Sequence, residues 1–557
     1  MRGVSAIRPS TRYPDLSWSA WGDPAAGMHL PDAILALLTQ ALGVRGPGRP
    51  VGAIEDVALP PSRVSDGVAS RLARIVDPEH ASVEHDARVR HLRGKSTPDL
   101  LRLRVGDVAG APDIVLYPDS HEQVLELLAA CSECRIAVVP FGGGTSVVGG
   151  LEPDASGFAG VAAIDMRRMN ALLELDEESR LAVFEPGLRG PEAEALLAER
   201  GYTIGHFPQS YEYATLGGAA AARSSGQSSA GYGRFDDLVM ALRVATPSGT
   251  LSLGRAPKSA AGPDLRQLIL GSEGALGVIT SLTVRVRPAP AVRVYEGWRL
   301  PSFVEGAAVV RRLVQDGPVP TVLRLSDEAE TALNLARPGE LGQGGAGGCL
   351  AIVGYEGSAS DVEARREGVV SVLRAAGAEP GDPDAGEAWA RERYRGPYLR
   401  DALLDAGAIV ETLETATFWS SLQRLYAAVS DALRESLTAL GTPPVILCHI
   451  SHVYPAGASL YYTFGCAALE DPVAQWRAAK AAVGEAILAT GGSITHHHGV
   501  GRDHLPWYER EVGELGIGAL RAVKARLDPA GILNPGVLLG VGDARADGAV
   551  GGGGGRD

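Results

Sequence analysis

The chain has 557 residues, too many for a single hydrophobic core, so two or three domains are expected. Hydrophobic residues account for 45% and charged residues for 21%, proportions typical of a globular protein. The net charge of −14, without any long basic run, argues against nucleic acid as the main partner and leaves an anionic small substrate open.

The expected secondary structure follows from hydrophobic spacing and turn residues. In chain order it comprises a helix over 31–42, a strand over 114–117, a helix capped by Ser120 with Gln123 completing a capping box, a strand over 136–139, a helix over 191–201, a strand over 278–286, strands over 321–325, 350–354 and 460–464, and a helix over 516–527. Near residue 291 the alternation of helices and strands gives way to a second unit with antiparallel strands.

These elements divide the chain into five expected segments. They are an N-terminal helical region (1–85), a ligand-binding α/β domain (86–290), a cap or substrate domain (291–485), a C-terminal segment that returns to the site (486–542) and a disordered glycine-rich tail (543–557). The N-terminus lacks the apolar core of a signal peptide, and no run approaches 18 apolar residues, so neither a signal peptide nor a transmembrane helix is predicted.

The cysteines indicate a reducing compartment, so a cytoplasmic protein is expected. There are five, an odd and sparse set that does not suggest a disulfide framework. Cys131 and Cys134 form a CxxC pair late in an apolar helix. Because neither a second pair nor a thioredoxin-like context accompanies them, we favour buried structural cysteines over a redox or metal role.

The most informative segment is a glycine loop that directly follows the strand over 136–139. It comprises Pro140, Phe141, Gly142, Gly143, Gly144, Thr145 and Ser146. Residues without Cβ let backbone N–H groups approach a ligand, and converging amides favour a diphosphate. The dinucleotide fingerprint fails at Val147, and no lysine follows Gly144 as a phosphate-binding loop requires, so NAD and ATP are disfavoured. A glycine-rich surface turn is the alternative.

Two further glycine clusters lie in the same α/β region. The second comprises Pro208, Gln209, Ser210, Tyr211, Glu212, Tyr213, Ala214, Thr215, Gly217 and Gly218, and continues to Ala221, Ala222, Arg223 and Ser224. The third comprises Glu273, Gly274, Ala275, Leu276, Gly277, Val278 and Ile279. Three such loops in one domain are hard to explain as turns alone, so they indicate a bound cofactor.

Together the three loops resemble the FAD-binding domain of the vanillyl-alcohol oxidase and p-cresol methylhydroxylase class, and residues 527–536 resemble its C-terminal signature. The resemblance implies an α+β fold, with a two-subdomain FAD-binding domain of the p-cresol methylhydroxylase type, an antiparallel-sheet α/β cap and a C-terminal helical segment. Members with covalent flavin often carry a His or Cys near these loops. The segment from Gly142 to Ser146 has neither, so we expect non-covalent FAD.

A narrower resemblance, to the alkyldihydroxyacetonephosphate synthase family, rests on the segments 18–22, 201–206 and 495–501. It implies an FAD-dependent transferase of ether-lipid synthesis. Such an enzyme exchanges the acyl chain of acyl-dihydroxyacetone phosphate for a fatty alcohol through a flavin adduct, with no net redox change. The implied partners are this phosphorylated lipid precursor and a long-chain alcohol. Loose contact with a membrane surface and a homodimer are also expected.

The resemblance assigns six residues to the chemistry. Tyr461 matches a proton-transferring tyrosine, Arg324 and Arg400 match substrate-binding arginines, and His496, His497 and His498 match a histidine run. A guanidinium fits a phosphate dianion, and a tyrosine can act as a base if neighbours lower its pKa. An imidazole of near-neutral pKa suits activation of the incoming alcohol, although which histidine serves is left open.

Each assignment has a plainer alternative. Tyr461 could be a packed aromatic, Arg400 a surface ion pair with Asp401 or Asp405, and Arg324 a pair with Asp327. The histidine run could be structural or bind a metal. No metal is expected, because consecutive residues alternate faces on a strand and a third ligand is not evident.

Two departures from the family pattern put the phosphate pocket and the lipid tunnel in doubt: His449 stands where the family tends to have Arg, and Thr463 where it has an aromatic residue. One competing function is an FAD-linked dehydrogenase or oxidase of D-2-hydroxy acids such as lactate or glycolate, which would pass electrons to an acceptor. Another is a flavin-binding scaffold at a membrane surface without catalysis.

Overall fold

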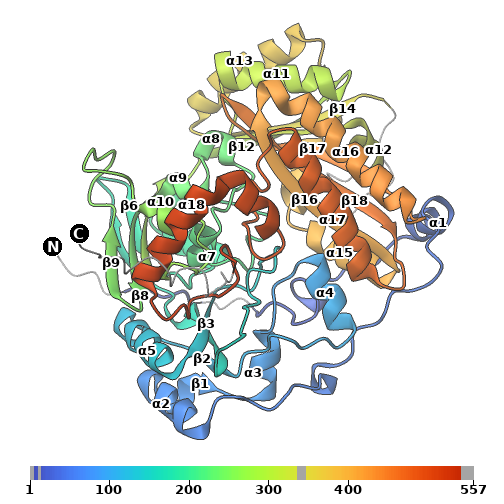
Figure 1. Ribbon diagram of the computed structural model, residues 1–557. Coiled ribbons are helices and arrows are strands. Elements are labelled where there is room, and N and C mark those ends of the chain that lie inside the picture. The colour runs from blue at the N-terminus through green and yellow to red at the C-terminus, as the bar shows by residue number, and fades with distance from the viewer. Residues whose placement is uncertain (1–5, 11–13, 335–346, 541–557) are drawn as a thin grey trace, which may run out of the picture.

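The computed structural model describes residues 6–10, 14–334 and 347–540. The glycine-rich tail predicted from residue 543 lies outside these ranges. Within them the chain forms a lower part built on two sheets and an upper part built on one large sheet, and the C-terminal segment runs between the two (Figure 1).

The first sheet carries the predicted glycine loop at the end of a buried strand. Its order is β1 (Ala81–Ser82), β2 (Ile114–Leu116), β4 (Gly160–Asp165) and β3 (Ile136–Phe141), with β2, β4 and β3 parallel. Helices α2 (Asp66–Val76) and α5 (His121–Cys134) pack on it through a shared apolar core. Strands buried on both faces read as continuous apolar runs, which is why β3 was predictable.

The capping box at α5 is only half formed. Ser120 accepts the backbone N–H of Gln123, as predicted, but the Gln123 side chain accepts from the N–H of Asp119 rather than that of Ser120. All five cysteines are free, and Cys131 is buried in α5.

The second sheet is antiparallel and carries the other two glycine clusters. Its order is β5 (Leu172–Asp176), β6 (Leu181–Phe184), β10 (Val278–Arg285), β8 (Val239–Thr246) and β9 (Gly249–Leu253). Helices α6 (Gly190–Ala198) and α7 (Leu216–Ala221) contribute to its core. A two-stranded ladder of β7 (Tyr202–Thr203) and β11 (Arg287–Pro288) lies beside it.

The upper sheet is a seven-stranded antiparallel sheet. Its order is β15 (Glu379–Pro380), β12 (Val292–Leu300), β14 (Cys349–Gly357), β13 (Val322–Ser326), β17 (Val445–Val453), β18 (Gly457–Ala467) and β16 (Ala408–Phe418). Helices α11 (Phe303–Asp316), α13 (Ala359–Ala375), α16 (Leu422–Ala439) and α17 (Pro472–Ala489) share one apolar core with it (Figure 1).

The alternation of side chains along these strands decides what faces the lower part. Leu323 and Leu325 are buried in the core under the helices, so Arg324 between them points to the other face. The same alternation in β18 buries Leu460 and Tyr462 and turns Tyr461 the opposite way. The sheet thus presents an apolar face to its helices and a polar face to the cavity below.

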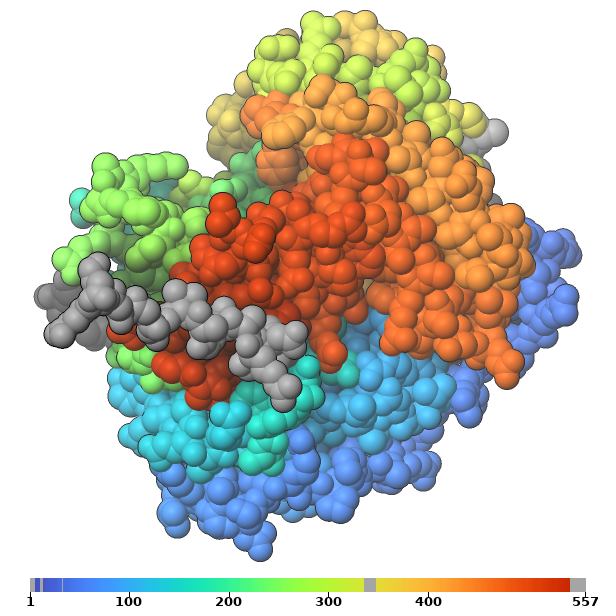
Figure 2. All heavy atoms as spheres, viewed as in Figure 1, coloured from blue at the N-terminus to red at the C-terminus, as the bar shows by residue number. Residues whose placement is uncertain are grey.

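The C-terminal segment returns to the glycine loops. Helix α18 (Leu505–Leu527) begins earlier than the predicted helix over 516–527 and contains a non-helical residue, Gly513, with φ of 78°. Beyond it, the Asn534 side chain donates to the backbone oxygens of Gly150 and Glu273. Figure 2 shows this segment wedged between the lower and upper parts.

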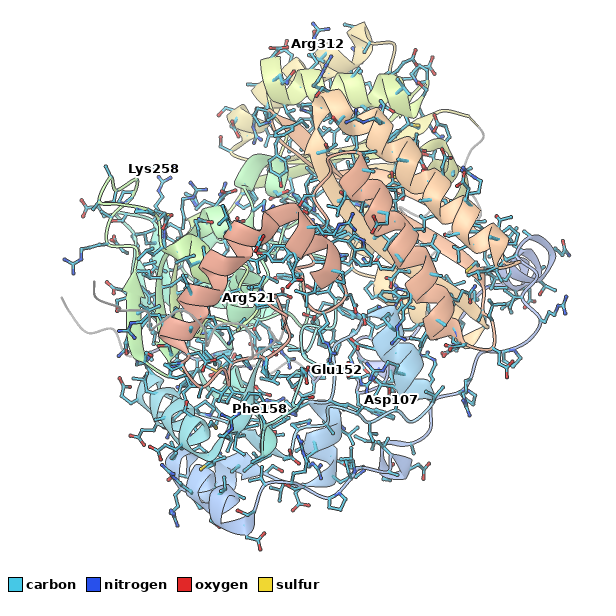
Figure 3. The ribbon with its side chains drawn as sticks, viewed as in Figure 1. Asp107, Glu152, Phe158, Lys258, Arg312 and Arg521 are labelled. Atoms are coloured by element: carbon cyan, nitrogen blue, oxygen red, sulfur yellow. The ribbon has the colours of Figure 1, made fainter. Side chains whose placement is uncertain are left out.

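The N-terminal region bridges the same two parts. Helix α1 (Asp32–Ala41) packs with β16 and α15 (Gly396–Asp405) through apolar side chains. Arg102 of α4 (Thr97–Arg104) bonds both Asp107 and Glu152, which lie side by side in Figure 3.

The remaining elements are short. The helices are α3 (His85–Arg90), α8 (Ser229–Tyr232), α9 (Phe235–Leu238), α10 (Arg266–Ile269), α12 (Glu328–Leu333) and α14 (Ala385–Glu392), with 3-10 turns at Pro24–Ala26, Ile54–Asp56, Pro78–His80, Met166–Arg168 and Trp419–Ser421. In the described ranges, no helix combines the length and the apolar character needed to cross a membrane.

Candidate functional site

The three glycine clusters and the polar face of the upper sheet enclose one cavity of about 460 Å³, within the range of small-molecule sites. Most of the predicted residues line it: Pro140, Phe141, Gly142, Gly143, Gly144, Thr145, Ser146, Pro208, Gln209, Ser210, Ala214, Thr215, Gly217, Gly218, Ala221, Ala222, Ser224, Glu273, Gly274, Gly277, Val278, Ile279, Arg324, Arg400, Tyr461, His497 and His498. The fold therefore gathers segments more than 350 residues apart around one space.

Seven predicted residues do not line the cavity and have other contacts. Tyr213 packs with Trp21 and Tyr398, while Tyr211 stacks on Tyr394. Arg223 donates to the backbone oxygens of Leu270 and Gln267. Glu212, Ala275, Leu276 and His496 complete this set, and both Ala275 and Leu276 are fully buried in core clusters. Most of these residues thus pack outside the cavity lining, against the glycine clusters to which they belong.

The first glycine loop fits a diphosphate. Among the described residues, the backbone N–H groups of Gly143, Gly144, Thr145 and Ser146 find no hydrogen-bond acceptor, although all four residues line the cavity. Buried amides are otherwise almost always paired, so these donors indicate an absent acceptor. The loop also needs its glycines, because a Cβ at Gly143 would collide with the carbonyl oxygen of Tyr213.

Glu273 joins the third glycine cluster to the C-terminal segment. Its carboxyl group accepts the backbone N–H groups of Val500 and Gly501 at 2.9–3.1 Å. Burial raises the pKa of Glu273 to about 7, although these two amides act to lower it. The segment that follows the histidine run is thus tied directly to a predicted cofactor loop.

Tyr461 lies at the centre of the polar sheet face. Its ring stacks on that of His449 at 4.9 Å and lies 6.1 Å from His497 and 5.7 Å from His498. Burial raises the pKa of Tyr461 to about 12, which the hydroxyl of Thr412 only partly offsets. The protein groups around Tyr461 therefore do not lower its pKa, as the predicted role of a base requires. The side chain is a neutral phenol.

Arg324 belongs to a buried network beside Tyr461. Its Nη2 donates to Glu330 Oε1 at 2.6 Å and lies 3.0 Å from His449 Nδ1, which is 2.9 Å from Glu330 Oε2. Against the effect of burial, the contacts with His449 and Arg324 hold the pKa of Glu330 far below its usual range, so the carboxylate stays ionised. The ion pair proposed with Asp327 is wrong, because Glu330, one helical turn further on, takes that place.

The neighbouring imidazole of His449 lies between both charged groups. Burial and the charge of Arg324 lower the pKa of His449, which favours its neutral form. Its Nδ1 lies between the Arg324 Nη2 donor at 3.0 Å and the Glu330 carboxylate at 2.9 Å, so it can accept from the first or donate to the second. Since His449 lines the cavity, it adds a neutral imidazole to the site where the family pattern led us to expect an arginine.

Arg400 is held by internal partners. Its Nε and Nη2 donate to Asp401 Oδ1, and its Nη1 donates to the backbone oxygen of Lys95. The ion pair with Asp401 is therefore present, but it is largely buried, with 11% of each side chain exposed. Asp405 pairs instead with Arg104.

The histidine run is a loop folded around the buried carboxylate of Glu414, on β16. Glu414 accepts the Thr495 hydroxyl at 2.6 Å and the backbone N–H groups of His496, His497 and His498 at 2.6, 3.2 and 3.0 Å. Three consecutive amides on one carboxylate require a turn rather than a strand. The expected alternation of the three side chains on opposite strand faces is therefore wrong.

A fourth imidazole joins the run. His452 stacks on His496 at 5.1 Å, and Nδ1 of His452 lies 3.0 and 2.8 Å from the hydroxyl oxygens of Ser225 and Ser229. One ring nitrogen from each of His452, His496 and His497 lies within 4.8 Å of the others, so the third imidazole thought to be missing exists. Tyr454 contacts the remaining nitrogen of His496 at 2.7 Å.

Most of these rings are neutral. Burial lowers the pKa of His498 to about 3 and holds the pKa values of His452 and His496 well below the usual value, and the His497 charge adds to the effect. The near-neutral pKa expected for a base of the run is therefore absent from these three rings. Neutral rings in contact with hydroxyls and with one another can accept or relay a proton.

The far wall of the cavity is apolar. It is formed by side chains from α1, α15 and the edge of the upper sheet, namely Ile34, Leu37, Leu38, Leu42, Leu399, Leu403, Ala408, Val410, Val445 and Leu447. Thr463, the second departure from the family pattern, lies on the same wall. The cavity thus has a polar end at Tyr461 and an extended apolar end.

Sequence reasoning missed four polar residues of the site: Glu330, Glu414, His452 and Arg393. Glu414 and His452 left a usable signal, since an ionisable residue that is buried within a strand must have a partner. Glu330 and Arg393 left none, because both occupy helical or helix-end positions that are usually solvated.

Comparisons with known proteins agree with this architecture. A family model described as "FAD binding domain" matches residues 112–253, and one described as "FAD linked oxidases, C-terminal domain" matches residues 289–538. The first range contains two of the glycine clusters. The second contains the upper sheet and the histidine run.

Whole-chain comparisons cover nearly all of the protein. It is 33% identical to an alkyldihydroxyacetonephosphate synthase of Dictyostelium discoideum over 573 residues, which span 95% of this chain and 94% of the relative. A solved alkyldihydroxyacetonephosphate synthase structure superimposes with a TM-score of 0.79 at 30% identity, covering 94% of this chain and 98% of that one. A substrate-bound p-cresol methylhydroxylase (TM-score 0.65, 16% identity, 86% of this chain and 98% of that one) shares the fold, as predicted.

Proposed function

Because this chain belongs to the alkyldihydroxyacetonephosphate synthase family, we propose that it is an FAD-dependent enzyme that exchanges the acyl chain of acyl-dihydroxyacetone phosphate for a long-chain alcohol. In this exchange the ester oxygen leaves with the fatty acid, and the alcohol oxygen forms the new ether bond. The observation that carries the proposal is a single cavity with cofactor loops on one side, a tyrosine and imidazoles on another, and an apolar wall beyond them.

Residues of this chain fit FAD on two counts. Four unpaired N–H groups of the first glycine loop suit the diphosphate, and the glycine clusters keep side chains out of the cavity. When bound, FAD supplies an electron-accepting ring beside which the exchange proceeds without net redox change. We propose that it is held non-covalently, since the loop from Gly142 to Ser146 offers no His or Cys for attachment.

Tyr461 and the imidazoles handle protons. The Tyr461 phenol oxygen is placed to exchange a proton with the carbon beside the substrate carbonyl, and the neighbouring rings of His449, His497 and His498 can take that proton onward. An imidazole of the histidine run accepts the hydroxyl proton of the incoming alcohol. The buried site excludes bulk water, which would otherwise compete with the alcohol.

The apolar wall receives the hydrocarbon chains. Leu37 of α1 lines the cavity with 41% of its surface exposed, and Leu35 on the same helix is equally exposed. A hydrocarbon chain that enters the cavity from a bilayer would contact these exposed leucines of α1. This supports loose contact of the protein with a membrane surface. We also propose a homodimer, on the family resemblance alone.

The test is to incubate the purified yellow holoenzyme with acyl-dihydroxyacetone phosphate and a fatty alcohol, and separately with D-lactate or glycolate. The proposal expects an ether product and a released fatty acid without lasting bleaching of the flavin. Bleaching by a hydroxy acid, without any ether product, would instead establish the dehydrogenase alternative. The apolar wall favours the synthase, because a short hydroxy acid has no hydrocarbon chain that could pack against this wall.

A further inference from the structure

A phosphate dianion in the cavity needs a guanidinium whose charge is not already neutralised. Arg400 is paired with Asp401, and Arg324 is paired with Glu330. Both arginines predicted as substrate anchors thus carry a carboxylate of their own. A buried guanidinium that already has a carboxylate partner attracts a further anion much less strongly.

Arg393 is a third cavity-lining arginine, and it differs in this respect. Within the described ranges it forms no ion pair, and its Nε and Nη1 are buried without a hydrogen-bond partner. Its guanidinium carbon lies 5.0 Å from the ring centre of Phe207, 5.6 Å from that of Trp389 and 5.1 Å from that of Tyr394. Three aromatic rings therefore surround the cation, and Nε and Nη1 stay free.

Two glutamine side chains that line the same cavity are also incompletely bonded. Gln227 donates its Nε2 to the backbone oxygen of Arg393 at 3.2 Å, and its Oε1 has no partner. Gln209, which lies against Gly396 at the start of α15, has an unpartnered Nε2. Both glutamines line the same cavity. Buried polar atoms without partners are rare, so four of them on residues that line one cavity indicate a polar ligand.

We propose that Arg393 and Gln209 bind the phosphate of the substrate headgroup, with Gln227 fixing the backbone of Arg393 and offering Oε1 to a ligand hydroxyl. The inference rests on the proposed function, whose substrate carries this phosphate. The free N–H groups on Nε and Nη1 of Arg393 lie on different sides of the guanidinium, so each is a separate donor, and the Gln209 amide supplies a third. Glu392 also lines the cavity, so the phosphate would have to lie on the guanidinium side, away from this carboxylate.

An FAD phosphate is the other source of the same chemistry, and the two can be separated. The four amides of the first glycine loop already suit the diphosphate, so we assign Arg393 to the substrate. The experiment uses the FAD-loaded enzyme and its R393Q and Q209L variants, with R391Q as the matched control, because Arg391 is exposed on α14. Calorimetry measures the affinity for dihydroxyacetone phosphate and for dihydroxyacetone, and flavin fluorescence measures the affinity for FAD.

R393Q is expected to weaken dihydroxyacetone phosphate binding about 10- to 100-fold and Q209L about 3- to 10-fold, the range for charged and neutral hydrogen bonds. In R393Q and Q209L, the affinities for FAD and for dihydroxyacetone should stay within about threefold of wild type, because neither ligand uses the phosphate contact. In R391Q, the affinity for dihydroxyacetone phosphate should also stay within about threefold, because a surface substitution changes little. Unchanged phosphate binding in both variants, or a loss of FAD affinity in its place, would overturn the inference. The proposed function has its own test, because ether formation by the wild-type enzyme is measured independently.

Discussion

Replacing Glu414 with glutamine tests how the histidine run is held. The carboxylate accepts one hydroxyl and three backbone N–H groups, and its Oε1 takes three of these four bonds. A glutamine can keep its oxygen at the Oε1 position, but its NH₂ group then faces the N–H of His496. That buried donor loses its partner at a cost of about 1–3 kcal/mol.

The three remaining bonds also weaken. Bonds to a charged acceptor contribute about 1 kcal/mol more than bonds to a neutral one, so they lose about 3 kcal/mol together. E414Q should therefore destabilise the loop by about 4–6 kcal/mol relative to its ordered state. The matched control is E435Q, at an exposed position on α16, which should change stability by less than about 0.5 kcal/mol.

Amide hydrogen exchange is the assay, because it reports opening of the segment itself rather than of the whole chain. In E414Q, the amides of 496–498 should exchange at least about 100-fold faster than in wild type, and they should be unchanged in E435Q. Wild-type exchange rates in E414Q would refute the reasoning, since they would mean that the carboxylate does not order the run.

The same carboxylate predicts a pH dependence with a definite sign. Burial alone would raise the pKa of Glu414, but His497, His498 and His496 hold it well below the usual value. A depressed carboxyl pKa contributes stability above the unfolded-state pKa of about 4, and this stability is lost as the pH falls through the folded-state value. Wild-type protection of the loop should therefore decline below about pH 4, and E414Q should lack this decline.

Three further substitutions address the rest of the site. Y461F should reduce ether formation at least about 100-fold while FAD absorbance and melting temperature stay unchanged, because only a proton-carrying oxygen is removed; retained turnover would return Tyr461 to a packing role. G143A should weaken FAD binding at least about 10-fold, since its Cβ would strike the Tyr213 carbonyl, whereas G67A, with open space around it, should not; flavin fluorescence titration compares them, and equal affinities would contradict the cofactor loop. E330Q should lower the unfolding free energy of the upper part by about 3–5 kcal/mol in urea, because it leaves a buried guanidinium unpaired; a midpoint at the wild-type value would contradict the pairing.

The cofactor loops were predictable because their information is local. A buried strand that ends in glycines defines a close backbone approach, whatever the rest of the chain does. Gly143 illustrates this point, since the sequence alone indicated a backbone site and the structure supplies the Tyr213 carbonyl that excludes a side chain. The FAD-binding fold followed from three such loops and has been confirmed by the comparisons.

The polar network was not predictable, because its partners come from distant strands and helices. The pairing of β17 with β18 places His449 opposite Tyr461, and α12, which directly follows β13, brings Glu330 to both His449 and Arg324. Sequence proximity suggested Asp327 as the partner of Arg324, yet the Asp327 side chain caps α12 by accepting the N–H of Glu330. An acidic residue just before a helix is more often its cap than an ion-pair partner, and this rule would have corrected the assignment.

The assignment of Arg324 and Arg400 as substrate anchors stays a prediction, and the proposal for Arg393 depends on the charges that remain after folding. Motif matching selects Arg324 and Arg400 by their neighbours in the chain, but binding depends on which cation remains unneutralised after folding. Glu330 and Asp401 pair with those two arginines, whereas three aromatic rings from two segments surround Arg393. Rings stabilise a guanidinium through its face and leave its edge donors to a ligand. An arginine in aromatic surroundings without an acidic partner is therefore the stronger candidate for an anion site.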